Sequence, residues 1–185
     1  MRTIIRVFLE ITVLLSGLAG LSGCSAGDTK QVTATLETST LAAAPLVGRS
    51  APDFEYQNNQ GETVSISDLK GKTVVLNFWA TWCGPCQIEM PLIQYLATDT
   101  SWADQGLVVL TVTDESAETV SAFTKAFGYS FTVLLDSQNA IANAYNIRYL
   151  PTTYIIGKDG VISYIKLGAF TDKTELEQTL NSVMK

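Results

Sequence analysis

The chain has 185 residues, among them 12 Lys or Arg, 18 Asp or Glu and no histidine, and its formal net charge at pH 7 is −6. The lack of histidine excludes Ser-His-Asp hydrolysis, Cys-His proteolysis, His-ligated zinc and axial ligation of haem by histidine. An acidic chain without runs of basic residues is a poor binder of nucleic acid, so proteins or neutral surfaces are the expected partners.

Residues 1–23 have the pattern of a processed leader. Arg2 and Arg6 supply a positively charged start, and residues 11–21 are apolar. The sequence Leu-Ser-Gly-Cys that ends at Cys24 resembles the lipobox of bacterial lipoproteins. This resemblance implies a signal peptide that is cleaved before Cys24 and a lipid attached to that cysteine. An uncleaved anchor is the alternative, but a spanning helix needs ~20 apolar residues and Glu10 shortens the run.

Both interpretations place the rest of the chain outside the cytoplasm. Residues 24–48 are rich in Ser, Thr and Ala, contain no aromatic residue and show no periodicity, which predicts a lipid-anchored flexible tether. A coil of this length spans roughly 25–30 Å on average, enough to lift a folded domain off a lipid surface. Residues 49–185 then form one domain that is large enough to bury a hydrophobic core.

The folded region is expected to begin with an N-terminal hairpin. Ala51–Tyr56 and Glu62–Ile66 are the two predicted strands, and residues 58–61 (Asn-Asn-Gln-Gly) are typical of the turn between them. Ser67–Gly71 follows and predicts a single helical turn that ends at glycine.

Two cysteines three positions apart follow this turn. The β-branched, apolar run Thr73–Ala80 is typical of a buried strand, and Gln87–Ala97 has a helical pattern. The strand therefore delivers Cys83 to a helix N-terminus, where unpaired N–H groups and the helix dipole favour the nucleophilic thiolate. Since Cys24 has a separate explanation, Cys83 and Cys86 are interpreted as a redox-active disulfide. Binding of Cu(I) by the pair is the weaker alternative.

The next segment alternates strands with helices. Leu107–Val112 is a continuous apolar run of the kind buried in parallel sheets. Ser116–Phe127 is a predicted helix that ends at Gly128. Phe131–Leu135 is then a predicted short strand, and Asn139–Tyr145 a predicted short helix.

The C-terminal part predicts a hairpin and a last helix. Thr153–Ile156 and Val161–Lys166 flank a Gly-Lys-Asp-Gly turn, and Asp172 with Glu175 fits a capping box at the helix start. The whole order of elements predicts an α/β fold, with a central mixed sheet and helices on both faces.

The ten residues that end at Cys86, Asn-Phe-Trp-Ala-Thr-Trp-Cys-Gly-Pro-Cys, and the later Leu-Pro-Thr-Thr resemble the thioredoxin superfamily. Within it, the Ala-Pro-Asp-Phe opening at Ala51 and the Ser67–Lys72 turn are similar to membrane-tethered, extracytoplasmic thiol-disulfide oxidoreductases of the ResA/TlpA type. The resemblance covers about residues 48–185. It implies a thioredoxin-like fold with one extra helix-strand unit between the redox helix and Pro151.

Thiol chemistry assigns Cys83 as the exposed nucleophile that attacks a substrate disulfide, and Cys86 as the shielded resolving cysteine. The resemblance also implies a cis bond before Pro151, where the backbone faces a bound substrate chain. Trp79 is expected in the core and Trp82 at the surface. No cofactor or metal is expected. Substrate contacts are predicted at six residues: Trp82, Gly84, Pro85, Leu150, Pro151 and Thr152.

Asn77 stands where thioredoxins usually carry a buried aspartate that assists the resolving cysteine. Glu89, three residues after Cys86, lies on the same helix face and is predicted to transfer the proton instead, with a pKa raised by partial burial. A solvated helix carboxylate without a role is the alternative for Glu89.

These residues predict an extracytoplasmic protein disulfide reductase. The resemblance implies cytochrome c maturation, with apocytochrome c as substrate, a membrane thiol carrier as electron donor and a monomeric enzyme held at the bacterial cell membrane by the lipid on Cys24. Gly-Pro between the cysteines favours a potential nearer ~−270 mV than ~−120 mV.

Two other classes of protein are alternatives to this reductase. A peroxiredoxin-like thiol peroxidase is disfavoured, because its Pro-x-x-x-Thr-x-x-Cys motif would need proline at Leu76 and threonine at Ala80. The third interpretation is a copper- or peptide-binding module on the same scaffold, without catalysis.

Overall fold

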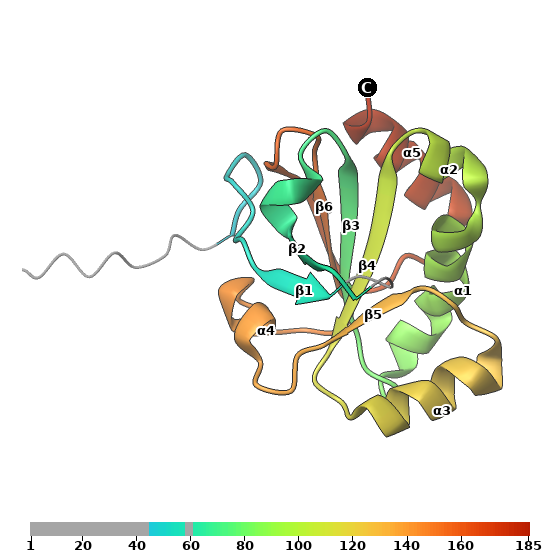
Figure 1. Cartoon of the computed structure of the whole chain (residues 1–185). Coiled ribbons are helices and arrows are strands. Elements are labelled where there is room, and N and C mark those ends of the chain that lie inside the picture. Colours follow the sequence, from blue (N-terminus) through green and yellow to red (C-terminus); the bar gives the residue numbers. More distant parts are fainter. Residues whose placement is uncertain (1–44, 58–60) are drawn as a thin grey trace, which may run out of the picture. The chain divides into compact units, whose positions relative to one another are not determined.

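A five-stranded mixed sheet with helices on both sides organises the structure, a computed structural model that describes residues 45–57 and 61–185 (Figure 1). The predicted leader, Cys24 and most of the predicted tether lie outside the described residues. Within the described part of the chain, no helix has the length and apolar character that crossing a bilayer requires.

The strand order in the sheet is β5-β4-β3-β6-β7. β3 (Thr73–Phe78) is parallel to β4 (Leu107–Thr113), and β4 is parallel to β5 (Thr132–Leu135). β6 (Thr152–Ile156) is antiparallel to β3, and β7 (Ile162–Leu167) is antiparallel to β6. β3 is the central strand and is buried along its whole length, as its β-branched sequence predicts. The predicted mixed sheet is therefore confirmed.

Helices cover both faces of the sheet, as predicted (Figure 1). The core of one face gathers around four helices: α1 (Gly84–Thr98), α2 (Thr100–Asp104), α3 (Ala117–Phe127) and α5 (Lys173–Val183). The core of the other face lies under smaller elements: β1 (Glu55–Gln57), β2 (Thr63–Ser65), the 3-10 turn η1 (Ile66–Leu69) and α4 (Ala140–Ala144). Strand residues alternate between the two cores, with Val75 in the first and Leu76 in the second.

The N-terminal hairpin is present, but its first strand begins later than the sequence predicts. Tyr56 pairs with Val64 in the antiparallel β1–β2 ladder, whereas Ala51 and Pro52 lie outside it. Pro52 has no N–H to donate to a ladder. The Ala51 N–H donates to the Gly160 carbonyl at 3.0 Å, so this segment runs along the β6–β7 turn.

A second difference is α2, which the sequence analysis did not predict. Asp99 caps this five-residue helix by accepting the Ser101 N–H at 2.9 Å. Trp102 buries its ring against the first core. The helix is too short to show a periodic pattern, and the cap is its sequence signal.

The start of α5 also differs from the prediction. Asp172 caps the helix by accepting the Thr174 N–H at 2.7 Å. Glu175, which a capping box would direct back to Asp172, pairs with Lys166 of β7. The predicted capping box is therefore wrong, because the Glu175 carboxylate forms an ion pair with Lys166 of β7 instead.

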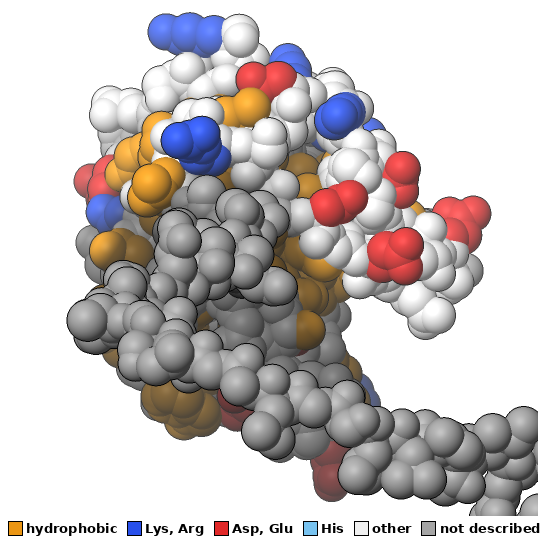
Figure 2. All heavy atoms as spheres, turned by 90° about the vertical axis from the view of Figure 1, so that its left-hand side faces the viewer, with side chains coloured by type: hydrophobic (Ala, Val, Ile, Leu, Met, Phe, Trp, Pro, Cys, Tyr) orange, Lys and Arg blue, Asp and Glu red, His pale blue; other side chains and the backbone are white. Residues whose placement is uncertain are grey.

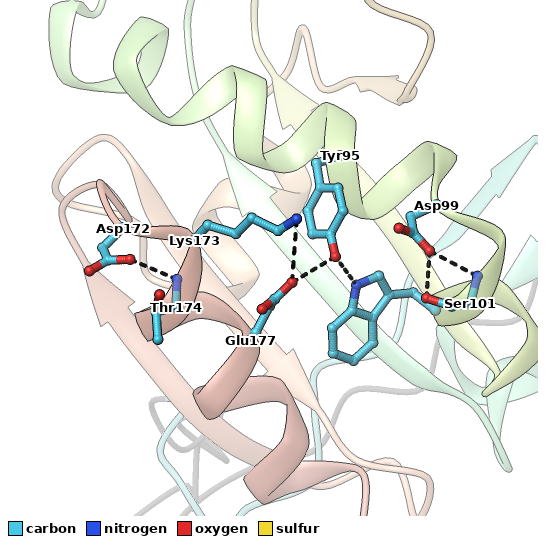
Figure 3. Close-up of polar contacts among 8 residues, drawn as sticks. Tyr95, Asp99, Ser101, Asp172, Lys173, Thr174 and Glu177 are labelled. Atoms are coloured by element: carbon cyan, nitrogen blue, oxygen red, sulfur yellow. Dashed lines mark hydrogen bonds and ion pairs between the residues drawn. The ribbon is translucent and has the colours of Figure 1, made fainter.

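Side chains from three helices join α1 to α5 (Figure 3). The Tyr95 hydroxyl on α1 donates to Glu177 on α5 at 2.7 Å and accepts the Trp102 indole N–H at 3.2 Å. Lys173 lies over the same tyrosine ring, 3.6 Å from its centroid, and 3.6 Å from the Glu177 carboxylate. These contacts fix the C-terminal half of α1 against the last helix.

We expect the Ile93→Ala variant to lose about 2–5 kcal/mol of unfolding free energy, because Ile93 is fully buried between α1 and the sheet. Ile88, on the same helix but 62% exposed, is the matched control, and Ile88→Ala should change stability by less than about 0.5 kcal/mol. Urea denaturation followed by tryptophan fluorescence measures both. Equal losses in the two variants would contradict the assigned packing face of α1.

Candidate active site

Cys83 is the N-cap residue of α1 and stands between the end of β3 and the first helical turn. Its Sγ accepts the Cys86 N–H at 3.2 Å, and Pro85 occupies a position in that turn where a helix needs no N–H donor. The two cysteines are joined by a disulfide, with their Cα atoms 5.2 Å apart. After reduction, the free N–H groups and the dipole of α1 favour a thiolate at Cys83.

The two sulfur-bearing residues differ in access. Cys83 is 5% exposed and lines a surface groove, whereas Cys86 is completely buried. Cys83, expected to be the exposed member, is therefore largely covered in the disulfide form, although it lines the groove. Its neighbour Trp82 is 72% exposed, in agreement with the prediction of a surface position. Trp79 is buried in the core, also as predicted.

The groove beside the disulfide has a volume of about 630 Å³. Four of the six predicted substrate contacts line it: Trp82, Gly84, Pro85 and Leu150. Pro151 follows a cis peptide bond and is buried, and its carbonyl accepts the Gly168 N–H at 2.9 Å. Thr152 is buried too, and its hydroxyl donates to the Tyr149 carbonyl at 2.8 Å.

The sequence analysis did not predict several of the residues that line the groove. Asp114 lies in the loop after β4, and Asn139 and Arg148 lie in the segments around α4. Tyr149 stands beside Leu150 in the lining. Their positions after predicted strands could have indicated them. Loops at the carboxyl ends of parallel strands meet at one edge of a sheet, and β3 and β4 both end at that edge.

Glu115 holds the loop that carries Cys83, and the sequence analysis missed this role as well. Its two carboxylate oxygens accept the Thr81 N–H and the Thr81 hydroxyl, each at 2.6 Å. Gln87 on α1 donates its side-chain N–H to the Thr81 carbonyl at 2.6 Å. All three polar groups of Thr81 are thus bound, which fixes the backbone just before the first cysteine.

Glu89 is fully buried on α1, three residues after Cys86. One carboxylate oxygen accepts the Asn77 side-chain N–H at 2.9 Å, and the other accepts the Phe170 backbone N–H at 3.0 Å. Asn77 also donates to the Thr153 hydroxyl at 2.9 Å. Burial raises the pKa of Glu89 to about 7, although the hydrogen bonds from Phe170 and Asn77 act in the opposite direction. Such a carboxyl group accepts and releases a proton near neutral pH.

A disulfide at the start of α1, beside the central strand of this mixed sheet, defines a thiol-disulfide oxidoreductase with a thioredoxin-like fold. Residues 47–165 match the AhpC/TSA family, and the chain belongs to this family. Over 145 residues the chain is 39% identical to the thiol-disulfide oxidoreductase ResA of Geobacillus kaustophilus, which covers 78% of this chain and 82% of that protein.

Two solved structures show the same fold. A thiol:disulfide interchange protein of the thioredoxin family from Chlorobium tepidum is 26% identical, with a TM-score of 0.65, and the match covers 77% of this chain and 100% of that one. The exposed lipoprotein thioredoxin Etrx1 of Streptococcus pneumoniae is 30% identical, with a TM-score of 0.56, and the match covers 71% and 99%. The resemblance to thiol-disulfide oxidoreductases of the ResA type and the thioredoxin-like fold that it implies are confirmed.

We expect the free energy of unfolding of the oxidised protein to fall as the pH rises from about 4.5 to about 7. The pKa of Glu89 is raised from 4.5 to about 7 in the folded chain, so the folded state binds a proton that the unfolded state has already released. The contribution is fully present below pH ~4.5 and is lost as the pH rises through ~7, by at most about 3 kcal/mol.

Glu89→Gln should remove this part of the pH dependence, because glutamine does not titrate. Urea denaturation between pH 4 and pH 8 measures the effect, and Glu118→Gln on the exposed side of α3 serves as control. Identical pH profiles for the wild type and Glu89→Gln would contradict the raised pKa.

Proposed function

We propose that this chain is an extracytoplasmic reductase of protein disulfides that uses the Cys83–Cys86 dithiol. The observation that carries the proposal is the disulfide at the N-terminus of α1, with one member on a groove and the other buried. The ResA relatives, which are named thiol-disulfide oxidoreductases, support the same reaction.

The reaction begins with the reduced pair. The Cys83 thiolate attacks one sulfur of the substrate disulfide, a mixed disulfide forms, and the other substrate sulfur leaves as a thiolate that takes up a proton. Cys86 then loses its proton and attacks Cys83 Sγ. The second substrate sulfur leaves, and the oxidised Cys83–Cys86 disulfide remains. Two electrons pass to the substrate, and an external thiol donor must return two electrons to the enzyme.

Glu89 is the group we assign to the proton of Cys86. Both side chains are buried on the same face of α1, so water is a poor proton acceptor at this position. Asn77 cannot take the proton that a strand aspartate would take, but it binds the Glu89 carboxylate and orients it. The pKa of about 7 supports proton transfer in the resolving step.

The groove supports a substrate segment that lies across Cys83. Trp82, Gly84 and Pro85 line the groove at the start of α1, and Leu150 lines it from the segment before β6. We assign Pro151 and Thr152 to the backbone on the Leu150 side of the groove, where the Thr152 hydroxyl holds the Tyr149 carbonyl.

The position in the cell belongs to the proposal as well. Cleavage after residue 23, lipid on Cys24, a tether over residues 24–48 and a domain over 49–185 would hold the enzyme on the outer face of the cell membrane. The name of the pneumococcal relative, an exposed lipoprotein thioredoxin, supports this arrangement. Apocytochrome c is the proposed substrate, a membrane thiol carrier the proposed donor, and the enzyme acts as a monomer.

The surface charges also support protein rather than nucleic acid as partner. On the face drawn in Figure 2, Lys and Arg side chains of the described residues stand singly, and apolar side chains lie among them. The net charge of −6 acts in the same direction, because nucleic acid binding depends on clustered positive charge.

The peroxidase alternative loses support at the two positions that its motif requires. Leu76 and Ala80 are completely buried core residues and carry no polar group toward the cysteines. Turnover of peroxide by the purified protein would favour that alternative over the reductase.

We expect the midpoint potential of the pair to lie nearer ~−270 mV than ~−120 mV, because Gly84-Pro85 is the pairing found in reducing thioredoxins. Equilibration with mixtures of reduced and oxidised glutathione, followed by alkylation and a gel shift, measures this potential. A value near ~−120 mV would identify an oxidant and overturn the proposed direction.

We expect the Cys86→Ser variant to accumulate mixed disulfides between Cys83 and its clients, because the resolving thiol is missing. Mass spectrometry of the adducts, isolated from cells that express the full chain, identifies the clients. The variant in which Cys83 and Cys86 are both serine is the control and should carry no adduct. Equal adduct levels in the two variants would remove Cys83 from the role of nucleophile.

A further inference from the structure

The junction between β7 and α5 connects the buried Glu89 carboxylate to a charged pair near the surface. The Phe170 N–H donates to Glu89 at 3.0 Å, and the Phe170 side chain is completely buried. The Lys166 ammonium lies 5.0 Å from the centroid of that ring and pairs with Glu175 on α5. Phe170 therefore contacts the carboxylate through its backbone and the lysine through its ring.

Polar and charged side chains on the neighbouring strands β3, β6 and β7 act on Glu89. Cys86 is on its own helix, and Asn77 and Thr153 bind one another beside it from β3 and β6. Lys166 of β7 is the charged residue that acts on Glu89, and Glu175 of α5 and Tyr164 of β7 act on Lys166 in turn.

Lys166 carries the positive charge of this set. Its attraction lowers the pKa of Glu89, and the Glu89 charge raises the pKa of Lys166 in return. Glu89 is completely buried and the Lys166 side chain is only 23% exposed, so solvent screens this attraction less than it screens a pair of fully exposed charges.

We propose that Lys166 and Glu175 are positioning residues for proton transfer in the reductase. Lys166 stabilises the ionised form of Glu89 across the Phe170 ring, and Glu175 weakens this effect because it binds the same ammonium. The pair thereby sets the pH range in which Glu89 accepts a proton from Cys86. This inference rests on the role proposed above for Glu89.

Two substitutions should move the Glu89 titration in opposite directions. Lys166→Met removes the positive charge but keeps the alkyl chain, so the Glu89 pKa should rise. Glu175→Gln leaves the ammonium without its anionic partner, so the Glu89 pKa should fall. Each change is expected to be about 0.2–0.7 pH unit, the range for one partly solvated charge pair.

The measurement is the carbon-13 chemical shift of the Glu89 carboxyl group in the full oxidised chain, titrated from pH 4 to pH 9 and assigned with Glu89→Gln. If Lys166 and Glu175 only hold the junction between β7 and α5 in place, the Glu89 pKa should change in the same direction in both variants, because either substitution would weaken the hydrogen bond from Phe170. Shifts of the same sign, or no shift in either variant, would overturn the inference.

Helix α5, which carries Glu175, also carries a matched control pair, Lys173 and Glu177. Lys173 lies over the Tyr95 ring and pairs with Glu177 (Figure 3), as Lys166 lies over Phe170 and pairs with Glu175. Lys173 is absent from the charges that act on Glu89. Lys173→Met and Glu177→Gln should therefore leave the Glu89 titration unchanged. A shift in the controls as large as in the test variants would also overturn the inference.

Kinetics separate a failure of this inference from a failure of the proposed function. The pH profile of disulfide reduction should move to higher pH in Lys166→Met and to lower pH in Glu175→Gln. Lys166→Arg, which keeps the positive charge, should have the wild-type profile. If Glu89→Gln leaves the thiol titration and the reduction rate unchanged, the role proposed for Glu89 fails, independently of the results for the Lys166 variants. If Glu89→Gln slows reduction but neither pair variant moves the carboxyl titration, the inference alone fails.

Discussion

The first turn of α1 imposes the constraint on which the site depends. Its N–H groups have no partner inside the helix, so the chain must bring an acceptor to this position. Cys83 meets that need through its sulfur, which accepts the Cys86 N–H. The central strand β3, paired with β4 and β6 on its two edges, ends at Phe78 and leads directly into this turn. The fold thus places a polarisable sulfur where positive potential is greatest, and the redox pair follows from ordinary helix capping.

A second constraint opposes the first. The site includes a carboxyl group inside the core, and burial makes its ionised form unfavourable. Asn77 and Phe170 compensate with one hydrogen bond to each oxygen, so Glu89 is neither fully stabilised as an anion nor fixed as an acid. The protein retains a group that reduces its stability at neutral pH. Such a conflict between stability and local chemistry is expected at functional sites.

Local contacts made several elements predictable from the sequence, although the short helix α2 was missed despite its local cap. Ser116 and Gly128 cap α3, and both ends of that helix were predicted. The redox pair was found for the same reason, because strand, cysteines and helix are adjacent in the chain. Glu175 was misread because its partner, Lys166, comes from another strand. Glu115 was missed in the same way: nothing near it in the sequence points to the loop that it binds.

The way in which the leading chain joins the sheet has a mechanical consequence. The Gly48 N–H donates to the Ile162 carbonyl, and Ser50 forms a bridge with Val161. Tension along the preceding residues therefore loads β7, the outermost strand on that side, which lies two places away from β3. These hydrogen bonds and the β6–β7 ladder bear the force as shear. A pull on the N-terminal segment is therefore taken up at the edge of the sheet, and β3, which leads into the helix that carries the two sulfurs, is not loaded directly.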